Sequence, residues 1–110
     1  MVEASAPPFA VSRCRHRVLG LQVRIEFADG FALRLMPAEA SSLSFALSAV
    51  RSGISPEREI YLSPIASDAA FVGTVRDDGI GIAVQSGTLE LDWPGVASLA
   101  DVLAAAIGQG

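Results

Sequence analysis

Cys14 and His16 are the residues of this sequence whose types and spacing could support catalysis. On a β-strand, side chains two residues apart share a face, so the thiol and the imidazole could touch. Cysteine catalysis also needs a third group that orients the imidazole. Nothing in the sequence supplies that group for His16. We therefore predict no catalytic residues here and an inert or oxidisable cysteine.

Three arginines surround this pair and form a candidate anion-binding site. Arg13, Arg15 and Arg17 alternate with other residues, which on a strand would place all three on one face. They leave the first 17 residues at a net charge of +2, against −6 for the remaining 93. The alternative is a solvated edge strand whose charges prevent pairing with another chain. The sequence leaves both interpretations open.

Carboxylates and glycines give no further site. Asp77 and Asp78 fall in a turn, where Asp is favoured because its side chain hydrogen-bonds the backbone. With Asp68 they could hold a metal only in a loop that wraps the ion, and the apolar residues after Gly79 do not form one. The Gly-Ile-Gly sequence at 79–81 does not lie between a strand and a helix, as a dinucleotide site requires. No metal or cofactor is predicted.

Composition limits the chain to one domain and disfavours several partners. The 110 residues suffice for one two-layer core. A net charge of −4 opposes binding to nucleic acid and to membranes, and no apolar stretch approaches the roughly 20 residues of a membrane span. The N-terminus lacks a secretory signal, so we expect a cytoplasmic protein. Lys and Asn are absent, which is typical of GC-rich coding, so the arginines alone do not indicate phosphate recognition.

Alternating apolar and polar residues predict a long strand over 18–27 with one buried face. A three-residue loop, 28–30, follows this strand. Only a pairing of Phe27 with Phe31 then keeps the apolar side chains of both strands on one face. This hairpin needs Gly30 in the left-handed conformation.

The same register has an electrostatic cost on the outer face of the hairpin. It places Arg24 directly opposite Arg34, and like charges in that position are destabilising. Glu26 lies diagonally across from Arg34. We therefore expect an ion pair between Glu26 and Arg34.

Two helices are predicted, and their outward faces carry few charges. The first covers 38–51 after Pro37, and the second runs from Pro94 to Gly108. A solvated helix normally displays charged side chains, whereas this chain is 51% hydrophobic and only 18% charged. Helix faces with so few charges indicate contact with the other helix or with a second subunit, although a coding bias toward Ala also explains them. The predicted interface residues are Ser41, Ser44, Phe45, Ser48, Ala97, Ala100 and Ala104.

Between the helices, the pattern predicts a short edge strand and a three-stranded meander. Their ranges are 60–62, 71–76, 80–85 and 88–92. Two-residue turns are expected at Asp78-Gly79 and Ser86-Gly87. In this register Val75 pairs with Ile82, and Ile82 pairs with Leu91.

An internal repeat sets the predicted architecture. A shift of fifty-six residues lays six residues of 33–49 on identical residues of 89–105. We predict a two-layer α+β sandwich, in which one antiparallel sheet of about six strands carries both helices on one face and consists of two related β-β-α units. The predicted ranges are 18–53 and 69–108 for the units, 9–110 for the single domain and 1–8 for a flexible tail.

The leading functional hypothesis is a non-catalytic interaction, regulatory or adaptor module of a bacterial type. It would form a homodimer or bind a protein partner through the Ser and Ala faces of its helices. The alternative is a small-ligand-binding domain or minor enzyme. Its pocket would lie between sheet and helices, near Tyr61, Trp93 and the basic N-terminal strand.

Overall fold

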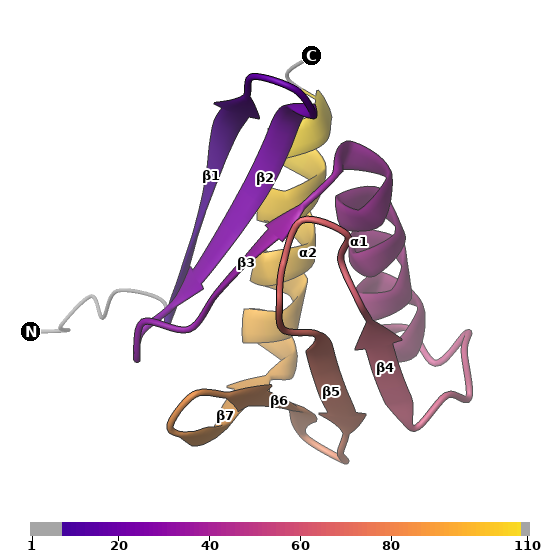
Figure 1. Ribbon diagram of the computed structural model, residues 1–110. Helices are drawn as coiled ribbons and strands as arrows, with labels where there is room; N and C mark the ends of the chain where they lie inside the picture. Colours follow the sequence, from indigo (N-terminus) through magenta and orange to yellow (C-terminus); the bar gives the residue numbers. More distant parts are fainter. Residues whose placement is uncertain (1–7, 109–110) are drawn as a thin grey trace, which may run out of the picture.

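A computed structural model describes residues 8–108 of the chain, and the N-terminal seven residues of the predicted tail lie outside it. The fold is α+β, as predicted, and it twice runs through an antiparallel meander into a helix (Figure 1). The helices begin at residues 37 and 93, fifty-six residues apart, as in the sequence repeat. The elements are β1 (Phe9–His16), β2 (Gly20–Phe27), β3 (Ala32–Leu35), α1 (Pro37–Arg51), β4 (Glu59–Leu62), β5 (Phe71–Val75), β6 (Gly79–Val84), β7 (Gly87–Asp92) and α2 (Trp93–Gly108).

The strands form two sheets, so the prediction of one six-stranded sheet was wrong. One sheet has the order β1-β2-β3 and the other β4-β5-β6-β7. The outer edge of β3 is bound by a side chain instead of by a further strand. The Ser67 hydroxyl accepts a hydrogen bond from the Arg34 N–H (2.6 Å) and donates one to the Arg34 carbonyl (3.0 Å). Ser67 thus binds the edge of β3 at which the first sheet ends.

The two helices form one layer that covers both sheets (Figure 1). Helix α2 contacts β1 and β2 of the first sheet and β6 and β7 of the second, while α1 contacts β2, β3 and β4. A single apolar core therefore lies between the helix pair and the two sheets. It connects the sheets by side-chain packing, since no backbone hydrogen bonds of a β-ladder connect them within the described residues. Its largest fully buried side chains are Phe27, Phe71, Ile25, Leu33, Leu35, Leu43, Leu47, Ile80, Ile82, Leu99, Leu103 and Val23.

The β2–β3 hairpin has the predicted register. Ile25 pairs with Leu33, and the Phe27 N–H donates to the Phe31 carbonyl across the loop (2.7 Å). Gly30 has a φ of +93°, a conformation that glycine adopts without the steric cost of a Cβ. The prediction therefore held because face parity and the need for one left-handed residue allowed a single solution.

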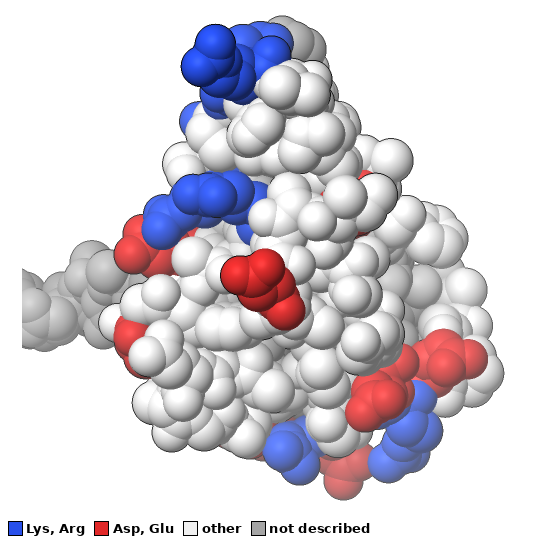
Figure 2. Space-filling view, viewed as in Figure 1, with Lys and Arg blue, Asp and Glu red and all other residues white. Residues whose placement is uncertain are grey.

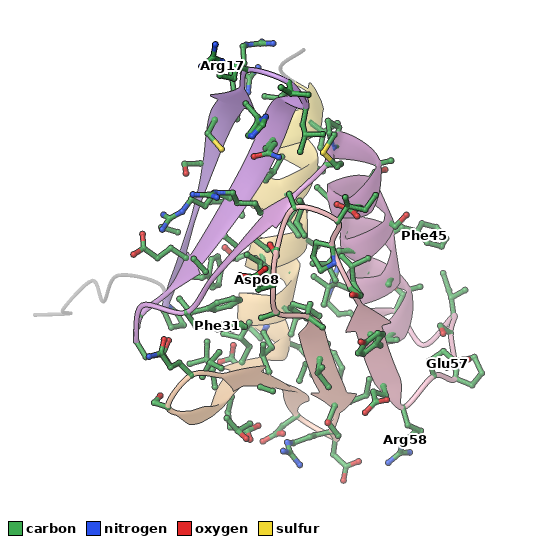
Figure 3. All side chains as sticks on the ribbon, viewed as in Figure 1. Arg17, Phe31, Phe45, Glu57, Arg58 and Asp68 are labelled. Carbon is green, nitrogen blue, oxygen red and sulfur yellow. The ribbon has the colours of Figure 1, made fainter. Side chains whose placement is uncertain are left out.

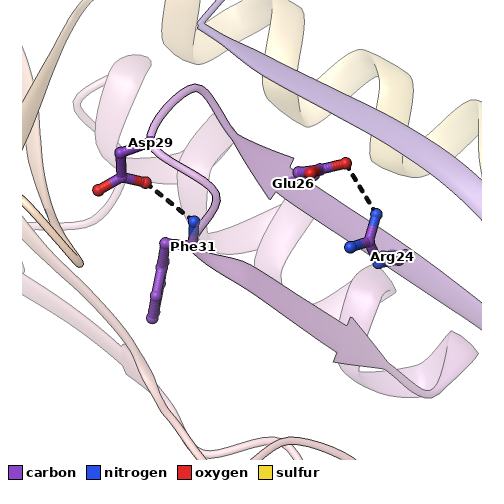
Figure 4. A network of polar contacts seen from close by, with 4 residues as sticks. All are labelled: Arg24, Glu26, Asp29 and Phe31. Carbon is purple, nitrogen blue, oxygen red and sulfur yellow. Dashed lines mark hydrogen bonds and ion pairs between the residues drawn. The ribbon is translucent and has the colours of Figure 1, made fainter.

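The ion pair on this hairpin differs from the expected one. Arg24 does lie opposite Arg34, but its Nη1 binds Glu26 Oε1 at 2.9 Å (Figure 4). Arg24 and Glu26 are two residues apart on β2 and share its outer face, so they meet without crossing to β3. Glu26 thus neutralises Arg24, and the charge of Arg34 is left for other contacts.

The meander register was predicted two residues out of place. Val75 pairs with Ile80 and not with Ile82, while Ile80 pairs with Leu91. The two-residue turns are therefore Asp77-Asp78 and Gln85-Ser86. Gly79 explains the shift, because a Cβ there would overlap the Leu91 carbonyl, which requires glycine inside the strand. A slip of two residues leaves every side chain on its predicted face.

Carboxylates of the β2–β3 hairpin and of α1 bind backbone N–H groups in the loops of the second sheet. Asp29 accepts from the Phe31 N–H in its own hairpin (2.9 Å, Figure 4) and from the Ser86 N–H in the β6–β7 turn (2.7 Å). Glu39 accepts from the Ile65 N–H in the β4–β5 loop (3.0 Å). The N–H of Phe31, and then that of Ser86, lowers the pKa of the Asp29 carboxyl below its usual value. Charged acceptors therefore fix the position of one sheet against the other.

This contact makes the stability of the protein depend on pH. Because folding lowers the pKa of Asp29, its stabilising effect is complete above the ordinary carboxyl pKa of about 3.9 and is lost as the pH falls through the lower folded value. We predict that Asp29→Asn lowers the free energy of unfolding at pH 6, and that its difference from the wild type shrinks toward pH 2.5. Urea unfolding at both pH values measures this, with Asp101→Asn as an exposed control. An equal difference at both pH values would contradict the assignment.

Candidate functional site

The two helices contact each other through two of the predicted interface residues. The Ser44 hydroxyl donates to the Ala100 carbonyl across the contact (2.8 Å), and Ala100 is only 2% exposed. Small side chains at these positions let the helix axes approach closely. Ala100 therefore packs within the chain and does not offer a surface to a partner, which corrects its assignment to an external interface.

A shallow groove lies on the outward side of the helix pair. It has a volume of about 420 Å³ and is lined by Ser41, Ser44, Phe45, Ser48, Ala104, Ile107 and Gly108. We call it the helix groove. Five of the seven predicted interface residues line it, while Ala97 is half-buried on α2. Phe45 is 75% exposed beside the groove and projects from α1 away from the core (Figure 3).

The helix groove contains no charged side chain. Across the two helices, 37–51 and 93–108, the charged residues are Glu39, Arg51 and Asp101, and none of them lines the groove. On the side of the molecule that Figure 2 shows, the surface near α1 is uncharged, whereas charges lie at the top, at the left, near the centre and along the lower edge. The face is thus suited to contact with another uncharged surface.

The three arginines do not share one strand face. Arg13 and Arg15 lie on β1 opposite Val23 and Leu21, and Arg17 follows the end of the strand in the β1–β2 turn. All three are exposed, and the described part of the chain gives them no ion pair. The C-terminal end of α2 lies at the same end of the molecule (Figures 1 and 3). The partial negative charge of a helix C-terminus favours cations within its last turn. Anion binding by the three arginines stays a prediction.

His16 serves the β1–β2 turn. Its Nδ1 accepts hydrogen bonds from the Val18 N–H (3.1 Å) and the Leu19 N–H (3.0 Å). The lone pair that a general base would use is therefore engaged with the backbone, and the ring is oriented by the turn. Cys14 is half-buried opposite Gln22 on β2. This role could not be predicted from the sequence, because histidine is not among the residues usual for such turns.

A second hollow lies where the two sheets meet, on the face away from the helices. This inter-sheet cleft has a volume of about 380 Å³, and its lining includes Arg24, Phe31, Arg34, Ser67, Asp68 and Gln85. The sequence did not indicate it, because its walls come from segments that only the folded chain brings together.

The pocket suggested between sheet and helices is occupied by core side chains. Trp93, predicted to line it, donates its indole N–H to the Asp77 carbonyl (2.9 Å). Tyr61 is 65% exposed on β4. The alternative of a ligand site between the two layers is therefore replaced by the inter-sheet cleft on the outer face.

No protein-family model, curated protein or solved structure matches this chain. Its function must therefore be inferred from its own surfaces. Neither helix is long and apolar enough to cross a membrane. Residues 8–108 also hold no group of three or more His, Cys, Asp and Glu side chains arranged to bind a metal ion.

The helix contact predicts different effects for two serines of α1. Ser44→Leu places a large side chain against buried Ala100 and removes the hydrogen bond, so we expect a loss of about 1–3 kcal/mol in the free energy of unfolding. Ser41→Leu, on the exposed side of the same helix, should change it by no more than about 0.5 kcal/mol. Urea unfolding of both variants measures this. Equal effects would mean that Ser44 is not in the helix contact.

Proposed function

We propose that this chain is a non-catalytic interaction module that forms a homodimer through the outward faces of α1 and α2. One observation carries the proposal: an exposed aromatic ring, Phe45, stands beside an uncharged groove on the same face. A cytoplasmic location and a regulatory or adaptor role are part of this proposal.

The arrangement of Phe45 and the helix groove is suited to a two-fold symmetric contact. In such an interface the same patch is used on both subunits, so a protrusion needs a matching hollow close to it on one surface. Phe45 of one copy would enter the groove of the second, and the reverse contact would follow by symmetry. The groove lining of Ser41, Ser48 and Ala104 leaves room for a ring because these side chains are small.

The energetics of this contact favour a second copy over water. Burying an exposed Phe side chain contributes roughly 1.5–3 kcal/mol, and a two-fold interface buries two. Central aromatic residues often carry most of the binding energy of an interface. The surrounding Ser hydroxyls and Ala methyl groups lose little side-chain entropy on contact. No charge in the groove has to be desolvated.

Sedimentation velocity tests the proposal at a protein concentration of about 100 µM, which is far above the Kd of a dimer with micromolar affinity. We expect the wild type to sediment as a dimer and Phe45→Glu as a monomer with an unchanged unfolding midpoint, because the new charge would have to be buried without a partner. Ile54→Glu is the matched control, since Ile54 is 78% exposed but lies outside the groove. A monomeric wild type would contradict the homodimer and would leave the helix face for a different protein. Equal dissociation of the dimer by Ile54→Glu would also contradict it.

A further inference from the structure

The inter-sheet cleft carries opposite charges on opposite walls. Arg24 and Arg34 belong to the wall formed by β2 and β3, while Asp68 belongs to the wall formed by the β4–β5 loop. Phe31 and Gln85 also line the cleft, and Gln85 comes from the β6–β7 turn. Figure 3 shows Phe31 and Asp68 at this junction between the sheets. The cleft is thus both polar and divided by charge.

The charges of the two walls do not meet. Within residues 8–108 the ion pairs closer than 4.0 Å are Arg24–Glu26 and Arg76–Glu90, so neither arginine of the cleft reaches Asp68. Arg34 also lies directly opposite Arg24 in the strand pairing, which is an unfavourable position for two like charges. Glu26 relieves that repulsion at Arg24 only. Arg34 and Asp68 therefore face the same cleft, each without a described ionic partner.

Hydrogen bonds fix the separation of the walls. The Ser67 hydroxyl binds both the N–H and the carbonyl of Arg34, which anchors the loop carrying Asp68 to the strand carrying Arg34. Asp29 binds the N–H of Ser86, next to Gln85 in the third segment. The backbone positions of Arg34 and of the loop that carries Asp68 are thus set by the fold before any ligand arrives. Such preorganisation reduces the entropic cost of binding.

We propose that the inter-sheet cleft binds a small zwitterion, a molecule with a carboxylate and an amino group a few bonds apart. The guanidinium of Arg34 pairs with the carboxylate, and Asp68 accepts from the ammonium group. Asp68 would repel a simple anion, and the two arginines would repel a simple cation. The volume of about 380 Å³ is within the range of small-molecule sites. This activity goes beyond the homodimer and uses the opposite face of the molecule.

Titration of the full chain with L-alanine, acetate and methylammonium, followed by amide NMR, tests the proposal. We expect L-alanine to shift the backbone amides of Arg34, Ser67 and Gln85 in a saturable way. Acetate and methylammonium, which each satisfy one wall, should bind at least about tenfold more weakly. Absence of saturable shifts with L-alanine, or larger shifts at Arg13–Arg17 than in the cleft, would overturn the proposal.

Variants separate the roles of the two walls. Arg34→Gln should abolish the L-alanine shifts, and Asp68→Asn should remove the preference for L-alanine over acetate. Arg58→Gln is the control, because Arg58 is an exposed arginine in the connector before β4 (Figure 3). Undiminished binding by Arg34→Gln, or a preference for L-alanine that survives Asp68→Asn, would refute the assignment. Phe45→Glu should bind L-alanine as the wild type does, so a failure of the homodimer and a failure of the cleft are distinguishable.

Discussion

The contact between α1 and α2 is the constraint on which the rest of the structure depends. Within residues 8–108, three strands form one sheet and four form the other, and no strand pairing joins them. Small isolated sheets are marginally stable in water unless an apolar face is covered. The helix pair provides that cover for both, because each helix reaches strands of both sheets. Ser44 and Ala100 allow this close approach, since a small hydroxyl meets a backbone carbonyl where larger side chains would hold the helices apart.

Much of the fold could be predicted from local sequence. The errors in the meander register and in the number of sheets have a common cause, because both depend on contacts between residues far apart in the chain. Alternation over 18–27 and the parity of the Phe27–Phe31 loop determined the hairpin, because a wrong register would expose its buried face. The meander was misplaced because a slip of two residues has no such penalty, and the steric demand at Gly79 comes from a strand that follows later in the chain. The edge at which the first sheet ends is bound through Ser67 and Arg34, thirty-three residues apart, and hydrophobic periodicity does not predict such a side-chain contact.

The candidate sites show the same limit. The low charge of the helix faces was visible in the sequence. Whether a serine faces the other helix or the solvent depends on how the helix is rotated about its axis. Ser44 contacts the other helix, whereas Ser41 is exposed. The inter-sheet cleft had no sequence signal, because Arg34 and Asp68 come to line the same cleft only after the β4–β5 loop packs on β3. The result is a molecule with an uncharged helix face on one side and a charged cleft on the other, so self-association would leave the cleft open.

Native-state hydrogen exchange tests most directly the claim that one helix pair holds both sheets in a single core. If the helices unite the sheets, the amides of Ile25 in β2 and Ile82 in β6 should exchange with the same free energy, equal to that of global unfolding. Exchange of the β6 amides through an opening of lower free energy, while those of β2 stay protected, would show that the second sheet unfolds by itself and would contradict the account.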